Sequence, residues 1–258
     1  IAIINSTSYG IETAAKNLKV DKGEKIIVLQ DQFPSNFLTW QRKAIDAQAQ
    51  LVIIPRPENY DWTTKVLEIL DKSVAIAALP PCHWTDGSFL DLEKIGKRCR
   101  ELEISLVVDA TQAIGAYPLN ISKIKPDFLV CSAYKWLLCP YTLCFLYVAP
   151  KYHNGVPLEL HRWNHQFSMG HTNNFFHPKL LNQKAPRFDM GEVNNYVSFP
   201  IALAGLDHIQ KWGTRNIHQY LSSLIKSVSE KALERGWGVP PEKYRIGHFI
   251  GMSNFKKF

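Results

Sequence analysis

The stretch DFLVCSAYKW, residues 127–136, decides the fold of this chain. Its apolar run at positions 128–131 predicts a buried strand, and a polar exit that carries Lys135 follows it. The upstream stretch ISLVVD, residues 104–109, has the same design and ends on Asp109. The carboxyl ends of parallel strands meet at one edge of an open α/β sheet, where such sheets bind ligands. We therefore expect Lys135 and Asp109 to face one small molecule.

A lysine and an aspartate at such an edge suit pyridoxal phosphate chemistry. The lysine forms a Schiff base with the aldehyde, and the aspartate keeps the pyridine nitrogen protonated so that the ring accepts electrons. For either residue alone, a surface lysine or an acid that caps the next helix is the commoner explanation, because both types crowd loops. The pair, together with the segments below, favours the cofactor.

The rest of the chain alternates between predicted strands and helices. This alternation predicts an α/β fold, a mostly parallel sheet sandwiched by helices. We divide the chain into a large cofactor-binding domain, 1–212, and a linker helix with the beginning of a truncated C-terminal α+β domain, 213–258. The strands are expected at 1–5, 25–29, 51–55, 74–79, 104–109, 128–131, 143–148 and from His248; the main helices at 11–18, 37–50, 62–71, 91–103, 200–212 and 214–235.

Composition narrows the class of protein. With 258 residues, 46% of them hydrophobic, the chain can bury a large core. The net charge of +7 is spread over scattered lysines and arginines, so we expect a solvated basic surface and no nucleic-acid partner. The most apolar stretch, 128–149, contains Lys135 and Pro140, which argues against a membrane span. Because Ile1 lies inside a strand-like run without a methionine, we expect a fragment.

The cysteines and histidines point to no metal or disulfide framework. The five cysteines are odd in number and form no Cys-x-x-Cys, which predicts buried thiols in a reducing, cytoplasmic compartment. His161 and His165 stand four apart, as zinc ligands on a helix do, but Pro157 and polar neighbours favour a loop there. We therefore predict no metal site.

Two further segments offer groups to a cofactor. The hydroxyls of residues 6–8 precede a predicted helix, where they suit either helix capping or a phosphate cup. Phe33 follows a predicted strand and precedes a proline; it suits either stacking on a cofactor ring or ordinary core packing.

Five motifs in order now carry a resemblance. STSYG at 6–10, QFPSN at 32–36, HWTDG at 83–87, VDATQ at 108–112 and SAYKW at 132–136 resemble the class V aminotransferase family. Its relatives include cysteine desulfurases, selenocysteine lyases, kynureninases and isopenicillin N epimerase-like proteins. The resemblance implies the type I pyridoxal phosphate fold, pyridoxal 5'-phosphate as cofactor, and a homodimer.

The resemblance also implies roles for individual residues. It makes Lys135 the Schiff-base lysine, Asp109 the acid on the pyridine nitrogen, and Gln112 the residue bonded to the phenolic oxygen. Its remaining assignments are the phosphate ligands Thr7, Ser8, Ser132 and Tyr134, the stacking aromatic Phe33, and His83 with Trp84 on the other side of the ring. The turn at 191–194 would approach the phosphate of the partner subunit.

The chain departs from the family pattern in three ways. Where the family tends to have Gly-Pro-x-Gly-x-Gly, residues 139–144 are CPYTLC, so a loop that needs glycine would be strained. The family's N-terminal helical segment and most of its small domain have no counterpart, and that domain normally supplies an arginine for the substrate carboxylate. The mobile cysteine of the desulfurases also has no counterpart.

The function expected from these residues is a pyridoxal phosphate-dependent enzyme that acts on an amino-acid substrate through an external aldimine. Displaced Lys135 would act as general acid–base at the α-carbon. Transamination, C–S or C–C lyase chemistry and epimerisation stay open. Desulfuration is less expected than these reactions, because of Phe33 and the missing nucleophilic cysteine.

Two rivals belong to other classes. A non-catalytic homologue that keeps the fold for binding or dimerisation is favoured by the lost glycines, and opposed by Lys135, Asp109 and Gln112. A nicotinamide-dependent Rossmann enzyme is suggested only by the alternation, and no Gly-x-Gly-x-x-Gly follows the first strand.

Overall fold

A seven-stranded sheet forms the centre of the protein in a computed structural model that describes residues 1–166 and 180–254. The strand order is β1-β7-β6-β5-β4-β2-β3. Each strand is an apolar run at an expected position, and the bounds are β1 Ala2–Ile4, β2 Lys25–Leu29, β3 Gln50–Ile54, β4 Val74–Leu79, β5 Ser105–Asp109, β6 Phe128–Ser132 and β7 Cys144–Val148.

All strands of this sheet run in one direction except β7. The pairs β2–β3, β2–β4, β4–β5 and β5–β6 are parallel, whereas β7 is antiparallel to both β6 and β1. Consequently β1, β5 and β6 all end at the same edge. Lys135 and Asp109 reach that edge because β6 and β5 are direct neighbours, with Asp109 opposite Val130.

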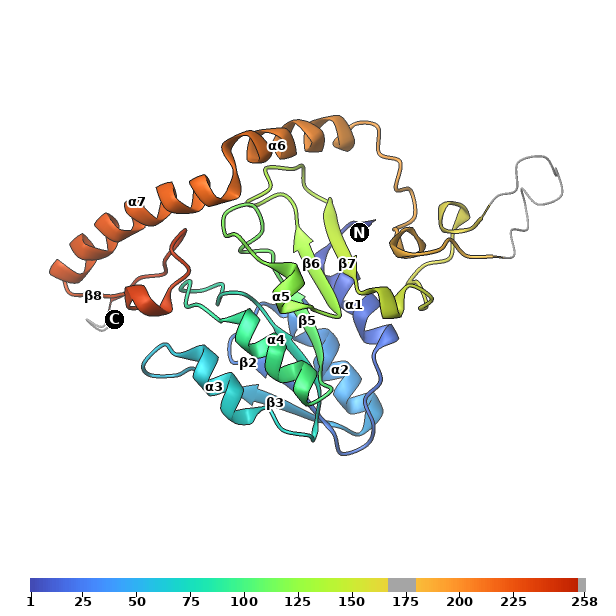
Figure 1. Ribbon diagram of the computed structural model, residues 1–258, viewed down its shortest axis with the longest axis horizontal. Helices are drawn as coiled ribbons and strands as arrows, with labels where there is room; N and C mark the ends of the chain where they lie inside the picture. Colours follow the sequence, from blue (N-terminus) through green and yellow to red (C-terminus); the bar gives the residue numbers. More distant parts are fainter. Residues whose placement is uncertain (167–179, 255–258) are drawn as a thin grey trace.

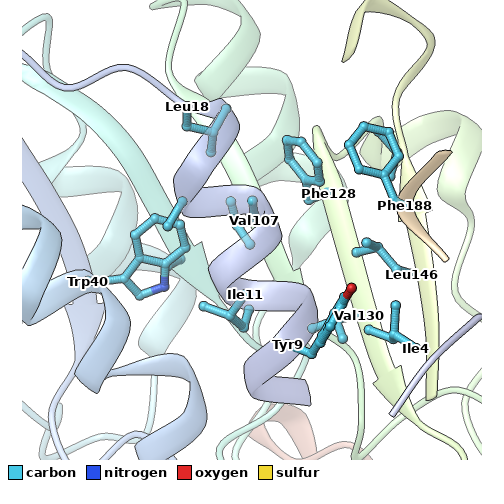
Figure 2. Packing of buried hydrophobic residues seen from close by; sticks show 14 of the residues in the cluster. Ile4, Tyr9, Ile11, Leu18, Trp40, Val107, Phe128, Val130, Leu146 and Phe188 are labelled. Atoms are coloured by element: carbon cyan, nitrogen blue, oxygen red, sulfur yellow. The ribbon is translucent and has the colours of Figure 1, made fainter. Parts of the chain in front are cut away.

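Helices cover both faces of the sheet (Figure 1). On one face, α1 (Thr7–Asn17) and α2 (Leu38–Ala47) share a core cluster with alternate residues of the strands, as Figure 2 shows around Ile11, Trp40 and Val130. On the other face, α3 (Trp62–Ile69), α4 (Leu92–Glu101) and the short α5 (Ile121–Ile124) bury a second cluster. The expected sheet sandwiched by helices is confirmed.

Two long helices follow the sheet, and a glycine separates them. Figure 1 shows α6 (Ser198–Trp212) and α7 (Thr214–Glu234) one after the other along one side of the molecule. Gly213 has a φ of +77°, a conformation that favours glycine and breaks the helix. At Gly205 of α6, an added Cβ would lie 2.5 Å from the carbonyl oxygen of Leu138, so α6 packs closely on the loop after Lys135.

The prediction of a strand that begins at His248 is wrong. A small antiparallel pair is formed instead by β8 (Trp237–Gly238) and β9 (Ser253–Asn254). Residues 244–251 bond to the loop after β4: Ile246 N donates to Gly87 O at 2.9 Å, and Gly251 N donates to Asp86 O at 3.0 Å. Short irregular contacts therefore replace a strand. None of the helices in the described part of the chain has the length and apolarity needed to cross a membrane.

Candidate functional site

A cavity of about 270 Å³ opens at the edge where β1, β5 and β6 end. Its walls come from the β1–α1 junction and from the segments that follow β2, β4, β5 and β6. The lining residues are Asn5, Ser6, Thr7, Gln32, Phe33, Ser35, Asn36, Pro80, Cys82, His83, Trp84, Asp109, Thr111, Gln112, Ser132, Tyr134, Lys135, Tyr141, Thr142 and Cys144. Eight of the nine predicted site residues are among them; Ser8 is not.

Lys135 and Asp109 lie in this cavity together. The Asp109 carboxylate accepts a hydrogen bond from Thr111 N at 3.1 Å. Burial raises the pKa of the Asp109 carboxyl, although the Thr111 bonds and the charge of Lys135 act in the opposite direction. Lys135 Nζ lies 5.6 Å from the ring centroid of Phe33 and 5.8 Å from that of Tyr134. Within the described residues, neither Asp109 nor Lys135 belongs to an ion pair.

Three hydroxyls from three strand ends meet beside α1. Thr7 Oγ1 lies 2.8 Å from Ser132 Oγ and 3.2 Å from Thr111 Oγ1. Thr111 Oγ1 also accepts a hydrogen bond from Ser132 N at 3.1 Å. The cluster forms because α1 begins at Thr7, one turn before the predicted start at residue 11. Hydroxyls and the free amides of a helix N-terminus together suit an anion.

Ser8 lies outside the cavity, which corrects its predicted position. Ser6 is the N-cap of α1, where its hydroxyl accepts a hydrogen bond from Tyr9 N. Ser8 is then the second helical residue. Its side chain is exposed and meets Ser6 Oγ at 3.1 Å. Ser6 therefore lines the cavity in place of Ser8.

Gln112 is held through both of its oxygens. Its side-chain Oε1 accepts a hydrogen bond from Trp136 Nε1 at 3.2 Å, and its main-chain oxygen accepts one from His248 Nε2 at 2.6 Å. Burial lowers the pKa of His248 to about 4, so this imidazole is neutral at pH 7.

Phe33 is a wall of the cavity and not a core residue. Its side chain is 38% exposed, which rules out the core alternative for this position. It contacts Trp84 edge to face at a centroid distance of 5.4 Å, and Trp84 Nε1 donates to Asp31 O at 2.7 Å. These two rings present apolar surface to the cavity.

His83 lines the cavity without a free ring nitrogen. Nε2 lies 2.9 Å from Gln30 O, an acceptor, so Nε2 carries the proton. Nδ1 then accepts from Thr85 Oγ1 at 2.7 Å and from Arg56 at 3.2 Å. Burial lowers the pKa of His83, and the charge of Arg56 acts in the same direction. His83 can therefore offer a ligand only its ring carbons.

Tyr134 and Tyr141 form a second aromatic pair beside Lys135. Their ring centroids are 4.4 Å apart. Burial raises the pKa of Tyr134, and Tyr141 adds to the effect. Both side chains line the cavity.

The cysteines are in no position to act as thiolates. All five are free and buried, and Cys82 and Cys144 line the cavity. Burial raises the pKa of Cys82 well above its usual value and raises that of Cys144 as well. A thiol whose pKa is raised by burial is a poor nucleophile.

Several lining residues were missed from the sequence. Thr111 belongs to the VDATQ motif. It follows Asp109 by two residues, and this position just after a predicted strand could have indicated that it lines the cavity. Ser6 was the first of three consecutive hydroxyl residues, and an earlier helix start would have selected it. Tyr141 carried no local signal, because only the antiparallel return of β7 brings it beside Tyr134.

Comparisons with known proteins agree on a family. A model described as "Aminotransferase class-V" matches residues 1–236. A probable cysteine desulfurase from Pyrococcus abyssi is 25% identical over 93% of this chain, and a kynureninase from Lodderomyces elongisporus is 28% identical over 59% of it. The structure of a C-DES mutant with glycine covalently linked to its pyridoxal phosphate cofactor has a TM-score of 0.76 and 18% identity, and it covers 91% of this chain.

The chain is shorter than the proteins it matches. It covers 59% of the Pyrococcus relative, 36% of the kynureninase and 61% of the C-DES chain.

Proposed function

Because this chain belongs to the aminotransferase class-V family, we propose that it is a pyridoxal phosphate-dependent enzyme acting on an amino-acid substrate. The observation that carries the proposal is the shared cavity of Lys135 and Asp109. A buried acid without an ion-pair partner among the described residues suits a protonated pyridine nitrogen. A lysine in the same cavity suits an aldehyde.

The donor groups around the cavity fit the other parts of this cofactor. The hydroxyls of Thr7 and Ser132, with Ser6 and the first amides of α1, would hold the phosphate. Tyr134 would add a phenol to the phosphate site. Phe33 would cover one face of the ring, and His83 would border it through carbon atoms. Gln112 would donate its amide N–H to the phenolic oxygen.

When bound, pyridoxal phosphate supplies an aldehyde that condenses with amines and a ring that accepts electrons from the substrate α-carbon. Asp109 would hold a proton at the pyridine nitrogen. Lys135 Nζ would hold the aldehyde and could move a proton at the α-carbon as general acid–base. Phe33 and Trp84 would present apolar surface to the bound group.

Among the reaction classes, C–S cleavage of a cysteine-type substrate is the second, finer candidate. A relative that spans 93% of this chain is named a probable cysteine desulfurase, which favours this reaction more than the sequence motifs did. The buried cysteines argue that the chain itself does not supply a sulfur-accepting thiolate. In this reaction the described residues would activate the α-carbon, and an external thiolate would attack the substrate sulfur. A persulfide would form as the C–S bond breaks, and the carbon would keep the bonding electrons and take up a proton.

The test is spectroscopic. We expect purified protein to develop a visible absorption band on addition of pyridoxal phosphate, and borohydride followed by peptide mapping to place the added mass on Lys135. In Lys135→Ala the reduced adduct disappears while phosphate affinity persists. An adduct that survives this substitution would refute the lysine assignment, and a wild-type protein without a band would favour the non-catalytic homologue.

A further inference from the structure

We propose that Trp136 is a positioning residue, which fixes the Gln112 carboxamide so that its NH2 group faces the cavity. The inference rests on the proposed function, because it names how one ligand-binding group of that site is oriented. Trp136 follows the lysine directly but is not among the lining residues. Its contribution would be made entirely through Gln112.

The chemistry of the indole decides which way the amide lies. Trp136 Nε1 and Gln112 Oε1 are 3.2 Å apart. An indole N–H only donates, so the amide atom that faces it must be the oxygen. The amide nitrogen, the other end of the planar group, is then directed away from Trp136. Since Gln112 lines the cavity, its NH2 is the group available to an acceptor on the ligand.

Trp136 is itself held in place on two sides. His248 meets its ring edge to face at a centroid distance of 4.7 Å, and Phe249 packs at 6.4 Å. His248 also donates to the main-chain oxygen of Gln112 at 2.6 Å. The same imidazole therefore supports the tryptophan and the glutamine, so the indole cannot move away without disturbing both contacts.

The backbone of Trp136 also lies close to the backbone of Gly115. Gly115 has a φ of +100°, and an added Cβ there would lie 2.2 Å from the carbonyl oxygen of Trp136. Because glycine has no Cβ, the turn that follows Asp109 can touch the loop that carries Lys135. Trp136 thus links the lysine loop and the aspartate turn at one point.

The first measurement needs no cofactor. In protein labelled with ¹⁵N at the indole nitrogens, the Trp136 resonance is assigned by its loss in Trp136→Phe. We expect Gln112→Leu to shift that resonance and speed its hydrogen exchange, whereas Trp163, which is exposed and does not line the cavity, keeps its resonance. An unmoved Trp136 resonance would overturn the proposal.

The second measurement uses pyridoxal phosphate. Trp136→Phe keeps an aromatic ring but removes the donor. We expect it to raise the Kd for pyridoxal phosphate, measured by absorbance, about 2–10-fold. The absorption band should move in the same direction as in Gln112→Leu. The double variant should be no worse than Gln112→Leu alone, and Trp163→Phe should match the wild type. Additive effects in the double variant would also overturn the proposal. If the indole resonance shifts but the wild-type protein shows no cofactor band, the proposed function is refuted while the proposal for Trp136 stands.

Discussion

Asp109 is the group whose environment is most unusual at the scale of single residues. Burial raises the pKa of its carboxyl in the folded protein above the unfolded value of about 3.9. Folding therefore takes up a proton between these two pKa values. The residue contributes most to stability at low pH, and that contribution is lost as the pH rises through the folded pKa.

Replacement of Asp109 by asparagine should stabilise the cofactor-free protein. The amide keeps the acceptor for Thr111 N but carries no charge, so we expect a gain on the order of 1 kcal/mol, about 2–4 °C in Tm, at pH 8. The gain should shrink towards pH 4. Thermal unfolding of both proteins over this range measures it, and a larger gain at acid pH than at pH 8 would contradict the burial argument.

The same substitution should slow the reaction at the α-carbon. Asparagine cannot hold a proton at the pyridine nitrogen, so we expect the exchange of the substrate α-proton in D2O to fall about 10²–10⁴-fold. Borohydride should still fix the cofactor to Lys135. Proton NMR measures the exchange, and an unchanged rate would rule Asp109 out of this role.

At the scale of elements, the loop between β6 and β7 carries unusual backbone. Leu138 and Thr142 have φ values of +57° and +63°, in the left-handed region that few β-branched residues adopt. The strain expected where the family pattern has glycine is therefore present at Thr142. Cys139, which also replaces a family glycine, lacks a positive φ and is buried.

A glycine at position 142 should be tolerated or stabilising. Relief of left-handed strain is about 1–2 kcal/mol, and the added freedom of the unfolded chain offsets about 0.4–1 kcal/mol of it. We therefore expect Thr142→Gly to gain between about 0 and 1.6 kcal/mol in urea unfolding. Cys139→Gly is the matched control and should destabilise, since it removes a buried side chain without relieving strain. The opposite order would count against the strain argument.

Gly115 should be more sensitive to an added side chain than a glycine with open space around it. Gly115→Ala adds a Cβ 2.2 Å from the Trp136 carbonyl oxygen and strains the backbone, so we expect a loss of more than about 2 kcal/mol. Gly236 also has a positive φ but no atom within 4 Å of an added Cβ, so Gly236→Ala should lose only about 1 kcal/mol. Urea unfolding of both variants compares them, and equal losses would mean that the close approach at Gly115 does not matter.

The positions of most elements could be predicted, because short apolar runs and helical periodicity are local properties. The direction of β7 is not local: it follows from the short loop after Lys135, and the alternation alone suggested a parallel sheet. The strand expected from His248 failed for a related reason. Gly247 has a φ of +91°, and the segment meets the loop after β4, a contact that local sequence does not encode.

At the scale of the whole molecule, the motifs that suggested a site come together because their strands end at one edge. Lys135, Asp109 and Thr7 were predictable from strand ends. The engagement of both ring nitrogens of His83 and the position of Ser8 were not, since they depend on the contact with Gln30 and on the first turn of α1. The domain boundary at residue 212 stays a prediction.

The exposed apolar side chains of α6 support a second copy of the chain as partner. Tyr196, Val197 and Leu203 are exposed on α6 and on the residues just before it, and α6 packs on the loop that follows Lys135. We expect the protein to sediment as a dimer and Leu203→Asp to sediment as a folded monomer. Leu233→Asp, on the exposed face of α7, is the control and should stay dimeric. A wild-type monomer at micromolar concentration would contradict this proposal.

The hydrogen bond from His248 to Gln112 spans 136 positions of the chain. At about 5–20 residues per second, a ribosome would release Gln112 roughly 7–27 s before His248. During that interval the sheet can form, but the glutamine lacks its support. A cofactor captured on the nascent chain would therefore meet a site that is still immature, and its final affinity would develop only after residues 244–251 have docked.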